Sequence, residues 1–249
     1  MIVTEPFKLI RNAIDYCKYN TKYLITTLLV LIIFQTIPEI VTLPPMLLFI
    51  YLLLEVILFT GYGLFIIHDI IDDGNQLPKF QLKNVMWLGI KGLIVITVYM
   101  SIQAIGTSVI STALSFSGFE LEDMVLNFTH TIHELLNHNP LYDTIFLVSG
   151  IVITYVTVFF MEIGLAMLAE GEPFKNSFSL KLIKEKIDKI GWREYFIEYS
   201  IVITSIILLT AIASLLRNFG IVTIMVNFLI FVIEYVAMGM VYKKSTIKK

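Results

Sequence analysis

The sequence predicts an all-α membrane protein, a bundle of about six transmembrane helices, and composition and clustering both lead there. The chain of 249 residues is 57% hydrophobic and 15% charged, whereas soluble domains are roughly 45–50% apolar and about 25% charged. Residues 92–119 and 199–216 contain no charged side chain, and about 20 apolar residues suffice to cross a bilayer as a helix. Apolar runs such as LITTLLVLIIF do not alternate as barrel strands would.

We expect the spans to form one integral membrane domain, residues 1–249. The start of the chain lacks a basic region followed by an apolar core and a cleavage site, so no removable signal peptide is expected. A single cysteine, Cys17, excludes an intrachain disulfide. Short connections predict tight hairpins between the first two and between the last two spans. The predicted spans are residues 23–43, 45–67, 92–116, 142–168, 196–216 and 219–242.

The distribution of Lys and Arg predicts the orientation, because these residues accumulate in cytoplasmic loops. Of 18 Lys and Arg residues, 17 lie on one side of the predicted spans, and only Arg217 lies on the other. The basic segments are residues 1–22, 68–91, 170–195 and 243–249. We therefore expect a multi-pass protein of the cell membrane with both termini in the cytoplasm.

Two of these basic segments, residues 68–91 and 170–195, and the spans beside them indicate a weak parallel hairpin repeat. In each, a span ends in Gly-Leu and apolar residues, followed by an acid-Gly pair, a proline and a basic amphipathic stretch with a Trp. Gly63 and Gly164 correspond, with about one helical turn deleted in the second copy. The same pattern also arises if all elbows at the inner membrane face look alike, and that alternative stays open.

The second elbow predicts a helix in the headgroup plane. Its apolar residues fall near one helical face, and Trp192 follows as an interfacial anchor. Basic residues there attract anionic lipid, although ordinary topology-setting charge is the slightly favoured explanation. The apolar residues are Phe178, Leu182, Ile183, Ile187 and Ile190. The candidate contacts to anionic lipid are Lys181, Lys184, Lys189 and Arg193.

The segment GYGLFIIHDIIDDGNQLPKFQLKNVMWLGIKGLIV, residues 61–95, resembles the signature of a prokaryotic, largely archaeal family of multi-pass membrane proteins, domain of unknown function 4013. Lys79 stands where the family usually has an acid, and His68 and Asp69 stand where it often has a base. The resemblance implies the fold and the membrane location and brings no known activity. The matching residues are Gly61, Tyr62, Gly74, Leu77, Pro78, Phe80, Gly89 or Gly92, and Lys91.

Three glutamates fall inside predicted spans: Glu55, Glu162 and Glu234. None has a basic neighbour within its own span, and an unpaired carboxylate in lipid costs at least ~2.5–3.5 kcal/mol on insertion scales. They are candidate intramembrane proton or cation groups, with Gln35, Gln103 and Asn227 available to complete a polar interior. The alternative is that they are protonated and tie helices together by hydrogen bonds.

The predicted outer loop contains the sequence NFTHTIHELLNHNP. Its histidines, His130, His133 and His138, lie near acidic residues and permit an external metal site, but a solvent-facing cluster on an amphipathic helix is the favoured interpretation. Asn127 begins a glycosylation sequon. No ligand pattern such as His-Glu-x-x-His occurs, and we predict no metal.

Three functions stay open at this point. The first is a non-enzymatic structural or lipid-interacting membrane component. The second is a proton- or cation-coupled transporter of small solutes that uses the three glutamates, and the third is a lipid-modifying membrane enzyme. The sequence has no Gly-rich phosphate loop and no Gly-x-Ser-x-Gly motif. We expect no catalytic residues and no cofactor, membrane lipids as partners, anionic headgroups among them, and no nucleic acid.

Overall fold

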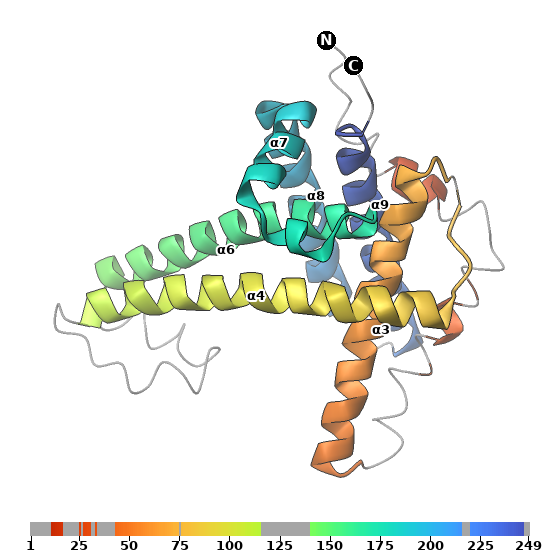
Figure 1. The fold of residues 1–249 in the computed structure, drawn as a ribbon. Helices are drawn as coiled ribbons and strands as arrows, with labels where there is room; N and C mark the ends of the chain where they lie inside the picture. Colours follow the sequence, from red (N-terminus) through yellow and green to blue (C-terminus); the bar gives the residue numbers. More distant parts are fainter. Residues whose placement is uncertain are drawn as a thin grey trace. The chain divides into compact units, whose positions relative to one another are not determined.

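The part of the chain that the computed structural model describes is mainly helical (Figure 1). The structure describes residues 11–16, 25, 27–30, 33, 43–74, 76–115, 140–215 and 220–246, and none of these lies in a strand. The helices are α3 (Pro45–Ile71), α4 (Leu82–Ser115), α6 (Pro140–Ala169), the 3-10 helix η1 (Phe174–Phe178), α7 (Leu180–Ile190), α8 (Trp192–Leu215) and α9 (Ile221–Lys243).

Five of these helices, α3, α4, α6, α8 and α9, are long and apolar enough to cross a membrane, so the chain is a multi-pass membrane protein. They match the second to sixth predicted spans, while most of the first, residues 23–43, lies outside the described residues. α4 begins ten residues before its predicted span. No proline follows Pro78 until Pro140, so nothing breaks the helix where its sequence turns from basic to apolar.

The described chain falls into two compact units, residues 1–95 with 162–249 and residues 96–161. In the second unit, the end of α4 pairs with the start of α6. The Gln103 side-chain amide donates a hydrogen bond to the Thr154 hydroxyl at 3.0 Å, and Gly106 lies opposite Ile153. A single membrane domain, residues 1–249, stays a prediction.

In the first unit, α9 packs along both α3 and α8. The core contains Tyr62, Ile66 and Ile70 of α3, four residues apart, and Val232 and Val236 of α9, also four apart. Residues at this spacing share one helical face. Each helix therefore presents a buried stripe to the other and leaves the opposite side for lipid or further helices.

Glycines bring the helices of this unit into direct backbone contact. A Cβ on Gly61 of α3 would lie 1.9 Å from the carbonyl oxygen of Val85 in α4, and one on Gly89 would lie 1.9 Å from that of Ile57. Small residues at such crossings let membrane helices associate by close van der Waals packing. On another side of α3, Gly63 accommodates the Tyr235 ring of α9.

The first elbow, residues 72–81, leaves α3 through a Schellman turn. The Asp73 N–H donates to the Ile70 carbonyl at 3.2 Å, and the Gly74 N–H donates to the Asp69 carbonyl at 2.7 Å. Asp73 has a positive φ of 65°, as the residue after the helix cap does in this motif. Within the described residues, the elbow then runs without helix until Leu82. Lys79 lies in this non-helical part, and Lys83 lies in the first turn of α4, so no separate interfacial helix precedes α4.

The second elbow, residues 170–191, leaves α6 through the same turn. The Gly171 N–H donates to the Leu168 carbonyl at 3.2 Å, and the Glu172 N–H donates to the Met167 carbonyl at 3.1 Å. Gly171 has a φ of 91°. The two bonds have the same spacing as in the first elbow, which agrees with the predicted repeat. The continuation differs, because η1 and α7 follow, with Ser179 capping α7 through the Leu182 N–H.

Candidate functional site

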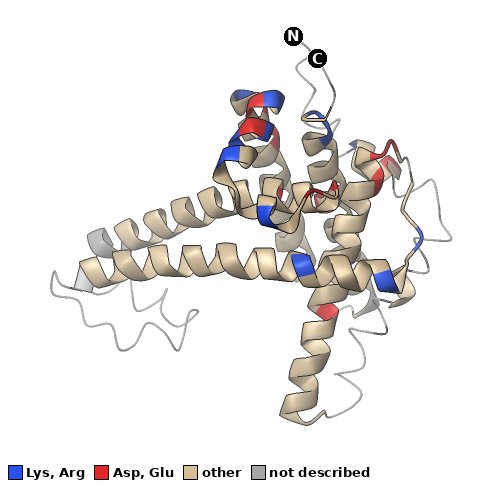
Figure 2. Cartoon of the chain, viewed as in Figure 1, with Lys and Arg blue, Asp and Glu red and all other residues tan. Residues whose placement is uncertain are grey.

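Charged side chains of the first unit gather at one end of α3, α8 and α9, together with α7 (Figure 2). The most buried cluster there joins Lys186 of α7 to the end of α6 and to α9. The Lys186 Nζ lies 2.5 Å from Glu170 Oε2 and 2.9 Å from Glu172 Oε1. The Tyr242 hydroxyl donates to the same Glu170 oxygen at 2.5 Å, and the Lys186 ammonium lies 5.1 Å from the Tyr242 ring centroid. We call these four residues the clamp.

The electrostatics of the clamp favour the charged forms of Glu172 and Lys186. Burial alone would raise the pKa of the Glu172 carboxyl, but hydrogen bonds from Lys186 and Asn176 bring it below its ordinary value. Burial would likewise lower the pKa of the Lys186 ammonium, but the two carboxylates raise it. The Lys186 side chain is only 12% exposed, so removing either carboxylate would leave a poorly solvated charge.

The last residues of α9 make two further ties. Lys244 forms ion pairs with Glu194, at 2.5 Å, and with Glu198, and both belong to α8. These bonds raise the pKa of the Lys244 ammonium, although burial acts in the opposite direction. Lys243 donates to the Ile70 carbonyl at 2.5 Å and pairs with Asp73 at 2.9 Å. A cation placed on the last carbonyls of α3 also complements the dipole of that helix.

Beyond the ion pair of Asp73 with Lys243, the first elbow is held by neutral groups. The Tyr62 hydroxyl donates to the Pro78 carbonyl at 3.1 Å and accepts a hydrogen bond from Thr27 at 3.2 Å. The Tyr62 ring packs on Phe80, with centroids 5.6 Å apart, and Leu77 is fully buried. Tyr62 thus fastens the extended elbow to the middle of α3.

Two of the three predicted intramembrane glutamates are brought together. Glu162 of α6 is 8% exposed, and its charge interacts with that of Glu234 of α9 and with Tyr235. No Lys or Arg pairs with either carboxylate in the part of the chain that the structure describes. Glu55 is separate, because its electrostatic neighbour is Tyr51 on its own helix.

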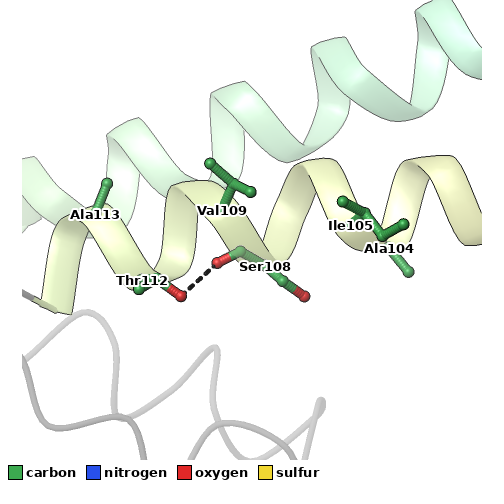
Figure 3. Close-up of a pocket in the computed structure, with 6 residues that line it drawn as sticks. All are labelled: Ala104, Ile105, Ser108, Val109, Thr112 and Ala113. Carbon is green, nitrogen blue, oxygen red and sulfur yellow. Dashed lines mark hydrogen bonds between the residues drawn. The ribbon is translucent and has the colours of Figure 1, made fainter.

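A groove of about 570 Å³ lies on α4 in the second unit (Figure 3). It is wide open, and all of the residues that line it come from this one helix. The Thr112 hydroxyl is already bound to the Ser108 carbonyl at 2.8 Å, so the groove offers little polar chemistry. The lining residues are Ala104, Ile105, Ser108, Val109, Thr112 and Ala113.

A family model described as "Protein of unknown function (DUF4013)" matches residues 45–218, which include both elbows. The chain belongs to this family. No curated protein and no solved structure matches the chain. The predicted resemblance is therefore confirmed, and DUF4013 membership brings no activity with it.

The residues that carried the resemblance to DUF4013 lie where the first elbow is fastened. Gly61 lets α3 touch α4, and Gly74 has no room for a side chain, because a Cβ there would lie 1.8 Å from the Asp69 carboxylate. Tyr62 binds the elbow, as described above. Lys91 lies one turn after Trp87 on α4, with its ammonium 5.0 Å from the Trp87 ring. The motif thus has a structural explanation in helix packing and elbow geometry.

The predicted lipid contacts of this DUF4013 member, Lys181, Lys184, Lys189 and Arg193, are all exposed. The sequence predicts that the apolar face of α7 lies in the headgroup plane. In the structure this face is not available to lipid, because Ile183, Ile187 and Ile190 are buried in the protein. α7 contacts α8 and α9. The outer-loop residues Asn127, His130, His133 and His138 lie outside the described part of the chain.

Sequence reasoning missed the clamp, although the sequence carries a signal for it. Lys186 follows Ile183 by three residues and precedes Ile190 by four, so it lies on the buried stripe of α7 rather than on its charged side. A lysine on such a stripe requires an acidic partner, and Glu170 and Glu172 are the acids that precede the helix. The part played by Tyr242, 72 residues away from Glu170, has no local signal.

Proposed function

We propose that this DUF4013 protein is a non-enzymatic structural component of the cell membrane. The helix ends that carry the charged side chains would lie at the cytoplasmic side of the membrane, and so would both termini of the chain. The observation that carries the proposal is the clamp, in which Lys186, Glu170, Glu172 and Tyr242 fix three helices to one another. The more buried charged groups at this end, Lys186 and Lys244, bind carboxylates and so join neighbouring helices. Such bonds serve to hold a fixed arrangement of helices.

The physics of helix association in a bilayer supports this role. Lipid tails are as apolar as the helix surfaces, so close packing and interhelical polar bonds determine the arrangement. The protein has both, since Gly61 and Gly89 bring α3 against α4, and Lys244 joins α9 to α8. The result would be a rigid frame at the predicted cytoplasmic side.

A second candidate function is proton or cation transport, favoured by the pairing of Glu162 with Glu234. Two neighbouring carboxylates in a membrane helix bundle, without a basic partner among the described residues, can share a proton or hold a cation. Intramembrane acids of this kind mark ion pathways in many transporters. Under the structural proposal the same pair is protonated and only joins α6 to α9.

Proton and cation flux in proteoliposomes separates the two functions. We would compare the wild type with Glu162→Gln/Glu234→Gln, and use Glu55→Gln as the matched control, because Glu55 lies apart from the pair. The structural proposal expects no flux in any of the three proteins, and lower stability in the double variant. Wild-type flux that persists in the control and disappears in a folded double variant would overturn it in favour of transport.

A further inference from the structure

The outer face of α7, continued by Arg193 at the start of α8, carries more basic than acidic side chains and points away from the protein. Lys181, Lys184, Lys189 and Arg193 are exposed, and none of them has an ion pair or hydrogen bond within the described residues. Lys189 is attracted to Glu172 at longer range. Exposed lysines are ordinary taken singly, but here three of them share α7, and Arg193 follows at the start of α8. Figure 2 shows bands of Lys and Arg along α7, with acidic bands between them.

The orientation of this face is fixed by the opposite side of the helix. Ile183 and Ile187 are fully buried, and the clamp holds Lys186 inward on Glu170 and Glu172. α7 therefore cannot rotate about its axis to pair its outer lysines with Glu170 and Glu172. The helix is also held close to the bilayer, because it follows the end of one spanning helix and directly precedes the next.

Exposed apolar side chains adjoin the basic face at both ends. Leu180, Trp192 and Phe196 are each more than 40% exposed, and the last two begin the spanning helix α8. Two carboxylates lie among the four basic residues: Glu185 is exposed, and Asp188 accepts a hydrogen bond from the Trp192 indole at 2.6 Å. Basic residues bordered by Trp and aliphatic side chains are typical of the interface between headgroups and acyl chains.

We propose that the outer face of α7 is a binding surface for anionic phospholipid headgroups. A lipid fits this surface better than an acidic protein segment, because its phosphate and its acyl chains would meet the basic and the apolar residues together. Lys181 and Lys184 would contact the phosphate, Arg193 would bind it with two N–H groups, and Trp192 and Phe196 would contact the upper acyl chain. This goes beyond the structural function proposed above and does not depend on it.

The test uses the full-length protein, purified in a neutral detergent. We would add phosphatidylglycerol or phosphatidylcholine with identical acyl chains and measure the lipid retained per protein and the shift in melting temperature. The variant is Lys181→Gln/Lys184→Gln/Arg193→Gln. The matched control, Lys79→Gln/Lys83→Gln/Lys175→Gln, removes the same number of positive charges from exposed positions outside α7.

We expect the wild type and the control to prefer phosphatidylglycerol, and the α7 variant to lose about tenfold or more of that preference, since each basic residue near an anionic surface contributes roughly a fivefold factor. The preference should weaken with salt. Equal losses in both variants would overturn the proposal in favour of nonspecific charge. No preference in the wild type would also overturn it and leave an acidic protein partner as the occupant. Equal melting temperatures of all three proteins without lipid would show that the substitutions leave the fold intact.

Discussion

The two elbows of the molecule begin alike and are held differently. Both leave a spanning helix through the same pair of turn hydrogen bonds, ending at Gly74 in the first and at Glu172 in the second. The first elbow is then fastened by the neutral bond between Tyr62 and Pro78. The second continues into α7 and is fastened by the ion pairs of Lys186.

This difference follows from what each elbow must hold. The first is a short chain without helix that packs Leu77 into the core. Close packing, the Tyr62 bond and the largely exposed ion pair of Asp73 with Lys243 hold it. The second carries an extra helix whose charged face is exposed, and only Lys186 on its inner face reaches the end of α6. A shared turn therefore sets the exit from the membrane, and the residues after it determine how rigidly the exit is held.

The largest loss of stability is expected at the crossing of α3 and α4, the two helices that the first elbow connects. Gly61→Ala places a Cβ 1.9 Å from the Val85 carbonyl oxygen, so α3 and α4 must move apart at a cost of about 3 kcal/mol or more. Gly150→Ala is the matched control, because nothing lies within 4 Å of its Cβ and alanine favours a helix. Unfolding in detergent measures both. Equal stability of the two variants would show that the α3–α4 crossing is not as close as described.

The second elbow should be most sensitive at its clamp. Lys186→Met keeps all but the last atom of the unbranched side-chain length and leaves Glu170 and Glu172 without their cation. We expect a loss of about 1–3 kcal/mol, between the values for exposed and buried ion pairs. Lys184→Met removes an exposed lysine from the same helix and should change stability little. Unfolding titrations of both variants test this, and similar losses would remove the distinction between the two faces of α7.

A smaller loss of stability is expected when the hydrogen bond from Tyr62 to Pro78 is removed. Tyr62→Phe retains the ring packing on Phe80 but removes the hydroxyl that binds the buried Pro78 carbonyl, at a cost of about 1 kcal/mol. Unfolding titrations provide the comparison with Lys186→Met. If Tyr62→Phe were the more damaging of the two, the neutral elbow would be the more tightly held, which reverses the comparison.

Sequence reasoning succeeded where the signal is local. The five described spanning helices follow from apolar runs. Gly171 marks the second turn because the motif favours glycine after the helix cap, and Gly74 marks the first because a Cβ there would lie 1.8 Å from the Asp69 carboxylate. Helix ends were less predictable, since α4 begins at Leu82, well before its apolar core. The pairing of Glu162 with Glu234 was not predictable, because it depends on which helices are neighbours, and periodicity within one helix carries no such information.

The smallest expected effect concerns pH, and it separates the elbows by chemistry. The folded pKa of Glu172 lies below its ordinary value of 4.5, so its contribution is complete above that value and is lost as the pH falls through the folded pKa. The folded pKa of Lys186 lies above 10.5, so its contribution is complete below 10.5 and is lost as the pH rises through the folded pKa.

Between these limits the clamp should therefore be insensitive to pH, and the melting temperature should change little from about pH 5 to 9 on its account. Below this window, Lys186→Met should lose less stability than the wild type, because its clamp is already broken. Tyr62→Phe should follow the wild-type acid profile, since the Tyr62–Pro78 bond contains no group that titrates there. Melting curves at matched pH values measure both differences, and a Lys186→Met profile that parallels the wild type would mean that acid acts on carboxylates outside the clamp.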